Sequence, residues 1–196
     1  MVAVPGTRRT FTPEEYLMVE RAAEFRSEYL DGEIYAMAGA SLAHVKINDS
    51  LTIEFGTRFN GTSCQGLSRD MKVPAGTGRL YAYPDFLIVC GEPQFRDTQT
   101  DVLTNPMIIF EILSPSTEQY DRTTKFDLYK KIVTMREYVL IAQDAPRVEH
   151  FVRMSDGSWR VNVLVGLDAS LELESAPASV PLVRIYNRID FTPAIT

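Results

Sequence analysis

The sequence is poor in the residues that build zinc sites and disulfide scaffolds. It has two cysteines, two histidines and one tryptophan, and none of its Cys or His residues has the short spacing of zinc ligands. A zinc site would need Cys64, Cys90, His44 and His150 to converge from distant positions. We therefore expect no zinc centre, and we expect both cysteines to stay reduced, as in a cytoplasmic protein.

Long apolar runs, glycine-rich loops and a surplus of positive charge are missing as well. No segment is long and apolar enough for a membrane span, and Arg8-Arg9 has no apolar stretch behind it, so neither membrane insertion nor secretion is expected. No phosphate-binding loop or dinucleotide fingerprint occurs. The net charge of -6 means that a nucleic-acid contact would need a local basic patch. The candidates for such a patch are Arg58, Arg69, Lys72, Lys130 and Lys131.

The sequence does contain enough apolar side chains for one core. With 196 residues, 45% of them hydrophobic, the chain can bury a core without disulfides. We expect residues 1–10 to be flexible and residues 11–192 to fold as one domain. The polar stretch 91–104 is either a mobile loop over a site or a plain surface loop. Helices are predicted over 13–25, 41–60 and 121–133, and hairpin turns at Asp31-Gly32 and 155–158.

Two apolar segments that are typical of buried strands each contain one carboxylate. Asp85 interrupts residues 81–90, and Glu111 lies inside residues 106–113. Burying an isolated carboxylate is so costly that it normally becomes protonated, pairs with a cation or binds a metal. Because Mg²⁺ prefers one or two carboxylates, waters and phosphate oxygens, neighbouring strands could bring Asp85 and Glu111 to one ion. The alternative is a strand-end carboxylate near solvent or paired with an arginine.

A lysine on the third predicted helix could add positive charge to this site. Asp121, Lys125 and Tyr129 are spaced four residues apart and share one helix face. The simpler interpretation is an exposed ion pair between Asp121 and Lys125. A cation beside the strand carboxylates would stabilise a hydroxide or a developing phosphorane. We favour Lys125 over Lys72 for this role.

Glu28 and His44 are further candidates for the site. Glu28 opens the first strand of the predicted hairpin, where an exposed glutamate is the usual case and a water-orienting carboxylate is the alternative. His44 falls in the first turns of the second helix and could bind a metal, shuttle a proton or contact phosphate, although a lone helical histidine is more often structural. His150 lies in a peripheral hairpin and is interpreted as structural.

Several short motifs follow one another in a distinctive order. They are Glu28–Ile34, Ala38–Ser41 before His44, Pro84-Asp85, Glu111–Thr117, Asp121, Lys125–Tyr129 and Glu137-Tyr138. In this order the chain, from about residue 11 to residue 191, resembles the Uma-two family of restriction-endonuclease-like proteins, within the PD-(D/E)XK nuclease superfamily. Leu113 stands where the superfamily usually has its lysine, and the resemblance implies that the helical Lys125 reaches the same space. Val139 stands where a tryptophan often follows Glu-Tyr.

The resemblance implies an α/β fold, namely a restriction-endonuclease-like mixed central β-sheet flanked by helices, with added β-hairpins. It also implies a Mg²⁺- or Mn²⁺-dependent nuclease that hydrolyses DNA. Asp85, Glu111 and the Ile112 carbonyl would hold the metal, and Lys125 would help to activate water. The remaining site residues, Glu28 and His44, would orient these groups or contact phosphate. An acidic domain without a recognition motif would grip DNA as a homodimer or with partners.

Two other functions stay open at this point. A non-catalytic module of the same fold would bind nucleic acid or a protein partner without needing a divalent metal. An acidic sugar hydrolase would use the same two carboxylates without a metal, and one of them would need a raised pKa. Metal dependence separates both alternatives from the nuclease.

Overall fold

The computed structural model describes residues 2–3 and 10–191 of the chain. Residues 1, 4–9 and 192–196 lie outside the described part. The predicted flexibility of residues 1–10 and the predicted domain boundary at 192 therefore stay predictions. Val2–Ala3 form strand β1, which pairs antiparallel with β3 (Glu33–Ala36).

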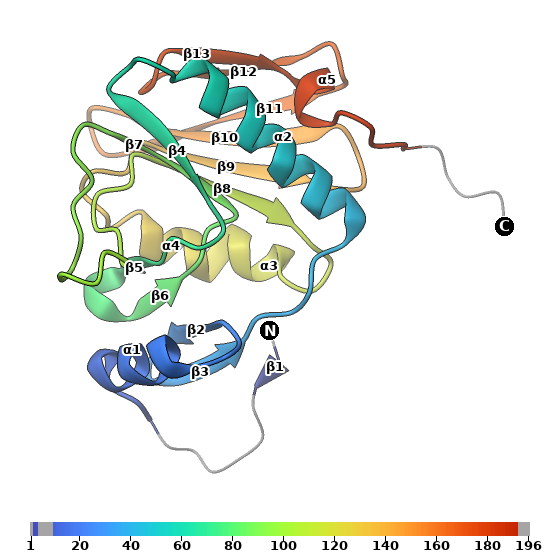
Figure 1. The fold of residues 1–196 in the computed structure, drawn as a ribbon. Coiled ribbons are helices and arrows are strands. Elements are labelled where there is room, and N and C mark those ends of the chain that lie inside the picture. The colour runs from blue at the N-terminus through green and yellow to red at the C-terminus, as the bar shows by residue number, and fades with distance from the viewer. Residues whose placement is uncertain (1, 4–9, 192–196) are drawn as a thin grey trace, which may run out of the picture.

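A mixed six-stranded sheet with the order β11-β10-β9-β8-β7-β4 runs through the middle of the molecule (Figure 1). Strands β8 and β9 are parallel, and the other neighbouring pairs are antiparallel. Apart from Glu111 and Glu137, the central strands are apolar runs, because both faces of the sheet are covered. The strands are β4 (Cys64–Ser68), β7 (Phe86–Cys90), β8 (Ile108–Leu113), β9 (Glu137–Ala142), β10 (Arg147–Arg153) and β11 (Trp159–Val165).

Helix α2 (Leu42–Arg58) crosses one face of this sheet (Figure 1). Ser41 caps the helix by accepting the His44 N–H, as the sequence predicted. Ile47 and Phe55 of α2 belong to a core that includes the even-numbered apolar side chains of β7 and β8. The same face is covered further by β12 (Ser170–Leu173), β13 (Ala178–Pro181) and α5 (Leu182–Ile185).

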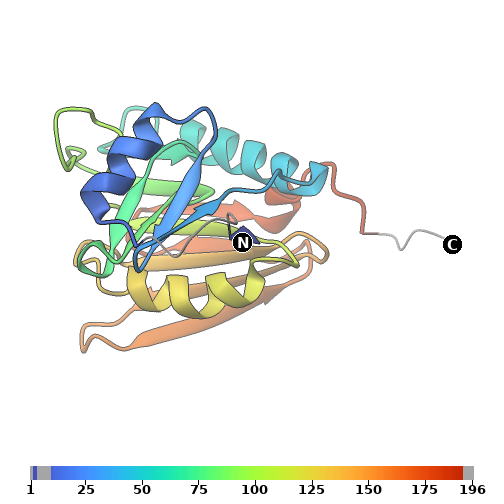
Figure 2. The ribbon, with the colours of Figure 1, turned by 90° about the horizontal axis from the view of Figure 1, so that it is seen from below.

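The opposite face carries one helical segment in three parts, which lies in front of the sheet in Figure 2. Its apolar side chains, including Leu128, pack on the odd-numbered side chains of β7 and β8. The helix predicted over 121–133 begins at Glu118 in the structure, and its last α-helical residue is Tyr129. The parts are α3 (Glu118–Tyr120), a π-helical turn (Asp121–Lys125) and α4 (Phe126–Tyr129).

A second sheet, with the order β1-β3-β2-β6-β5, lies at one end of the central sheet together with helix α1 (Figure 1). Thr12 and Glu15 form a capping box at the start of α1. Asp31 and Gly32 both take positive φ in the β2–β3 turn, which confirms the predicted hairpin. The elements are α1 (Pro13–Ala22), β2 (Ser27–Leu30), β5 (Val73–Ala75), a 3₁₀ turn (Gly76–Gly78) and β6 (Leu80–Ala82).

Two expectations need correction. The cysteines are not reduced in this structure, because Cys64 and Cys90 form a disulfide. They stand directly opposite each other in the β4–β7 ladder, a proximity that their distance in sequence concealed. Of the two alternatives for the stretch 91–104, a loop over the site is not supported, because none of its residues lines the cleft described below. It is not a plain surface loop either, since Val102 and Leu103 are buried and bridge to neighbouring segments.

Among the residues that the structure describes, no helix is both long and apolar enough to cross a bilayer. The cytoplasmic location stays a prediction.

Candidate active site

Asp85 lies where β7 separates from β8. The last ladder pair of these strands is Phe86 with Phe110, so Asp85 stands opposite Glu111 one step further along. Beyond this ladder pair the backbone hydrogen bonds between the two strands end. A side-chain hydrogen bond follows instead, in which Asp85 Oδ2 accepts the Ile112 N–H at 2.7 Å. The two strand carboxylates therefore meet at the end of the strand pairing.

Helix α2 holds Asp85 from the other side. His44 Nε2 lies 2.8 Å from Asp85 Oδ1, and the Asn48 amide donates to the Asp85 carbonyl oxygen at 2.7 Å. His44 and Asn48 are four residues apart and so share one face of the helix. The Asp85 side chain is 18% exposed, which places it at the border between the core and solvent.

Lys125 is a buried cation that three carboxylates share. Its Nζ lies 2.9 Å from Glu111 Oε1, 3.4 Å from Glu28 Oε1 and 3.7 Å from Asp121 Oδ1. The exposed fractions of the Lys125 and Asp121 side chains are both 5%. The interpretation of an exposed Asp121–Lys125 pair is therefore wrong.

The helical segment changes its geometry at these residues. Asp121–Lys125 form a π-helical turn, and such turns are frequent at functional sites. The Tyr138 hydroxyl donates to the Asp121 carbonyl oxygen at 3.0 Å, and the Tyr129 hydroxyl lies 3.4 Å from Glu111 Oε1. These contacts hold the turn against the central sheet, with its acid and its lysine buried.

Glu28 reaches into the same cluster from the second sheet. It accepts the Tyr83 N–H at 3.1 Å in addition to its contact with Lys125. Its side chain is 10% exposed, so the expectation of an exposed strand-end glutamate is wrong. Glu28 thereby joins β2 both to the helical lysine and to the segment that leads into Asp85.

The one ammonium group of this cluster, that of Lys125, lies within 3.7 Å of three carboxylates. Burial raises the pKa of Glu111 well above its usual range, and Lys125 only partly opposes this rise. Burial also raises the pKa of Asp121. For Lys125, burial alone would lower the pKa, but the attraction of Glu111 and Glu28 outweighs burial and raises it well above its usual range. Lys125 therefore stays charged, while the carboxylates compete for a proton or a further cation.

The cluster opens into a cleft of about 1160 Å³. Four arginines also line this cleft: Arg26, Arg69, Arg122 and Arg147. All four form ion pairs with acidic residues at 2.5 to 3.5 Å. The cleft therefore has cations near it, but their charge is already partly neutralised. The predicted site residues that line it are Glu28, His44, Asp85, Glu111, Ile112 and Lys125.

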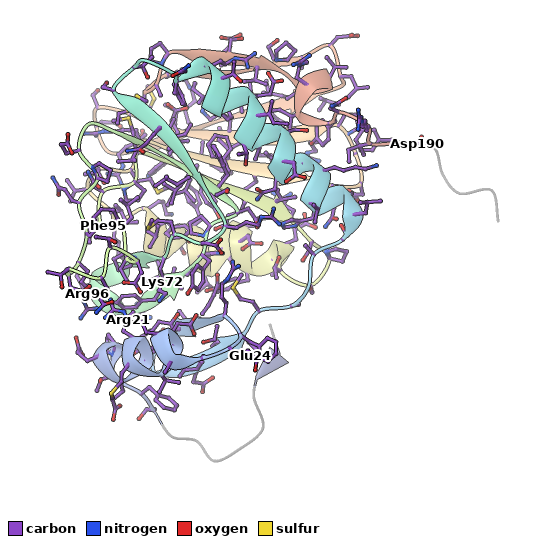
Figure 3. All side chains as sticks on the ribbon, in the orientation of Figure 1. Arg21, Glu24, Lys72, Phe95, Arg96 and Asp190 are labelled. Atoms are coloured by element: carbon purple, nitrogen blue, oxygen red, sulfur yellow. A yellow bond between two sulfur atoms is a disulfide. The ribbon has the colours of Figure 1, made fainter. Side chains whose placement is uncertain are left out.

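The predicted basic patch is wrong in most of its members. Among its five residues, only Arg69 lines the cleft. Arg58 and Lys130 pair with acidic residues three or four positions earlier in the chain. Lys72 is 2% exposed and lies beside α1, close to Arg21 and Arg96 (Figure 3). Lys72 is therefore not a rival to Lys125 in this cluster.

The donor set of the cluster fits a hard divalent cation. Within the described part of the chain, no three Asp, Glu, His or Cys side chains are placed to hold a metal together. A metal here would rest on two carboxylates, a backbone carbonyl and water, which is common for Mg²⁺. The uncompensated negative charge around Glu111 would favour such an ion. The Ile112 carbonyl stays the predicted third oxygen ligand.

Sequence reasoning missed two residues beside this cluster. Of the side-chain polar atoms that the structure describes, the Tyr120 hydroxyl and Asn48 Oδ1 are buried without a hydrogen-bond partner. A buried polar atom without a partner often marks the place of a water or ligand. Asn48 could have been found from its four-residue spacing to His44, whereas nothing in the sequence around Tyr120 distinguishes it from a packing aromatic.

A mixed sheet with helices on both faces, and with its acidic cluster where strand pairing ends, places the protein in the restriction-endonuclease-like class. Residues 13–182 match the Uma2 family, which is described as "Putative restriction endonuclease". The match spans most of the sequence, and the chain belongs to this family.

Relatives and a solved structure agree with this assignment. Two proteins of Synechocystis sp., the uncharacterized proteins sll1609 and slr1290, are each 34% identical to this chain. The matches cover 86% and 92% of this chain and 96% and 93% of the relatives. A crystal structure of a putative nuclease of the DUF820 family from Anabaena variabilis has a TM-score of 0.72 and 18% identity, covering 90% of this chain and 97% of that one. This likeness shows the shared fold.

Proposed function

We propose that the protein is a divalent-metal-dependent endonuclease that hydrolyses phosphodiester bonds in DNA. The observation that carries this proposal is the buried ammonium of Lys125, which three carboxylates share at the edge of a cleft. Membership of the Uma2 family, described as "Putative restriction endonuclease", supports it. Phosphodiester hydrolysis needs positive charge where the attacking water and the phosphate become more negative.

Each residue of the cluster would have a separate part in this reaction. Asp85 and Glu111 would hold the metal with the Ile112 carbonyl, and a bound Mg²⁺ or Mn²⁺ would supply positive charge for the phosphate and the attacking water. Lys125 would stabilise the developing hydroxide. Glu28 would keep the Lys125 ammonium in place through their contact at 3.4 Å.

Three further residues would position these groups. His44 would fix the rotamer of Asp85 through their contact at 2.8 Å. Asp121 would hold the other side of the Lys125 ammonium. The unpartnered Tyr120 hydroxyl would donate to a water or to a phosphate oxygen.

Cleavage of DNA in Mg²⁺ or Mn²⁺, compared with Ca²⁺ and with EDTA, tests the proposal. K125M should lower the cleavage rate by about 10²-fold or more, because a positioned charge is lost from the transition state. E111Q and D85N should also abolish Mg²⁺-dependent cleavage. The matched controls are K130M and E92Q, whose positions do not line the cleft. Unchanged cleavage by K125M and E111Q would refute the assigned site.

The alternatives give different outcomes in the same assay. A non-catalytic module would bind nucleic acid or a protein partner and would not cut DNA in any metal. A sugar hydrolase would be insensitive to EDTA and inactive on DNA. Two observations favour the nuclease over both alternatives. The chain belongs to the Uma2 family, and three carboxylates share the Lys125 ammonium.

A further inference from the structure

We propose that Phe25 is a stacking platform for an unpaired base, and that the cleft accepts single-stranded rather than duplex DNA. This substrate class rests on the proposed nuclease function. The Phe25 side chain is 78% exposed, and it also lines the cleft. Exposure of an apolar ring to water is unfavourable. Stacking of the ring on a nucleic-acid base is favourable, and it does not depend on the nucleotide sequence.

The hairpin of the second sheet positions this ring in the same cleft as the carboxylate–lysine cluster. Phe25 precedes β2, the strand that contributes Glu28 to the cluster. The Met37 N–H donates to the Arg26 carbonyl oxygen at 3.1 Å, which prolongs the hairpin ladder toward Phe25. Met37 is 41% exposed and lines the cleft as well, so it adds a second apolar surface. Glu24 lies at the end of this sheet near the linker to α2 (Figure 3).

The charges around Phe25 favour a base over a phosphate at this corner. Arg26 forms an ion pair with Asp70 at 2.5 Å and lies 5.7 Å from the Tyr83 ring centre. Glu24 also lines this part of the cleft and carries negative charge. A phosphate would therefore meet a partly neutralised arginine and a carboxylate, whereas an uncharged base would meet an exposed ring.

The same balance argues against a duplex as the substrate. Duplex affinity comes largely from neutralisation of phosphates by Lys and Arg, but this chain has a net charge of -6 and its cleft arginines are all paired. Bases within a duplex are stacked on one another and cannot reach an aromatic side chain unless they are extruded. A single strand could instead gain affinity from Phe25 while its backbone extends toward Lys125.

Fluorescence anisotropy in Ca²⁺ tests this inference with a labelled strand of about 16 nucleotides, the upper end of known single-strand site sizes, and with the same strand annealed to its complement. We expect the single strand to bind more tightly than the duplex. F25A should weaken single-strand binding by about tenfold, within the range for loss of one base stack, and should leave duplex binding unchanged. F25W should restore the affinity because it keeps an aromatic face.

M18A is the matched control, since Met18 is 68% exposed on α1 and lies outside the cleft. It should bind both DNAs like the wild type. Tighter binding of the duplex, or an equal response of F25A and M18A, would overturn the inference. If the wild type still cleaves duplex DNA in Mg²⁺ in that case, the nuclease proposal stands. If neither DNA binds and neither is cut, both the platform and the nuclease are refuted.

Discussion

Two buried lysines, Lys125 and Lys72, have similar neighbours and different electrostatics. Each ammonium lies between 5.3 and 6.0 Å from the centres of two tyrosine rings. Each is also paired with a carboxylate, at 2.9 Å for Lys125 with Glu111 and at 3.4 Å for Lys72 with Asp101. Burial and aromatic contact alone therefore do not separate the two sites.

The balance of charge does separate them. Burial lowers the pKa of Lys72, and Asp101 opposes this shift without overcoming it. Asp101 is already paired with Arg21 at 2.6 Å, so the surroundings of Lys72 need no further cation. Lys125 faces several carboxylates, its pKa is raised, and its cluster opens into the cleft. Unbalanced negative charge beside a cleft is what marks a candidate functional site.

The largest expected effect comes from replacing each lysine by methionine. At about pH 8, K125M should lower the free energy of unfolding by about 3–5 kcal/mol, because it leaves buried carboxylates without their cation. K72M should cost about 1 kcal/mol, since Asp101 keeps Arg21 as its partner. Urea unfolding of the two variants measures the difference. Equal losses would show that the two lysines have the same structural role, and the comparison would fail.

A second effect, of intermediate size, concerns pH. The pKa of Glu111 is raised in the folded protein, chiefly by burial. A carboxyl group of this kind stabilises the fold fully below its unfolded pKa, and that stability is lost as the pH rises through the folded pKa. The metal-free protein should therefore lose stability as the pH rises above about 4.5, the ordinary value for glutamate. E111Q should flatten this decline by about 1.4 kcal/mol for each unit of pKa shift.

Metal binding should reverse the same decline. Because a bound metal would replace a proton in the cluster, Mg²⁺ should raise the Tm more at high pH than at low pH. E111Q should abolish this Mg²⁺-dependent rise, whereas E92Q should retain it. A rise in Tm that is the same for E111Q and for the wild type would mean that Glu111 does not bind the metal.

The sequence predicted those parts of this site that depend on local pattern. Asp85 and Glu111 became candidates because each interrupts an apolar segment of the sequence, and the Asp31-Gly32 turn and the Ser41 cap follow from local backbone chemistry. The four-residue spacing made Lys125 a candidate beside the alternative of an exposed ion pair, and the family resemblance then implied its role as the active-site lysine. The strand order and the covering of both faces agree with the fold that the resemblance implied.

The sequence did not predict the contacts between distant segments. Glu28 and Lys125 are 97 residues apart, and Glu28 and the Tyr83 N–H are 55 apart. The burial of Glu28 arises only when the second sheet packs against the helical segment, so its local pattern was that of an exposed strand end. The disulfide has the same origin, because the β4–β7 register brings its cysteines together. The predicted basic patch was wrong in most of its members, because the positions of lysines and arginines in the sequence do not reveal which of them are buried or paired with acids.

The smallest expected effect compares one hydroxyl from each lysine site. The Tyr120 hydroxyl, near Lys125, is buried without a hydrogen-bond partner, whereas the Tyr83 hydroxyl, near Lys72, donates to Glu20 at 2.8 Å. Y83F should therefore lower the free energy of unfolding by about 1 kcal/mol, and Y120F should leave it unchanged or raise it slightly.

The cleavage rate should respond in the opposite way at Tyr120. If its hydroxyl donates to a water or a phosphate oxygen during the reaction, Y120F should slow Mg²⁺-dependent cleavage by about tenfold, which corresponds to one hydrogen bond to a charged group. The measurement is the single-turnover rate of Y120F beside its urea unfolding curve. A Y120F protein that loses stability and keeps its full rate would identify the hydroxyl as a packing group, and the Lys125 site would then lose one of the features that distinguish it from the Lys72 site.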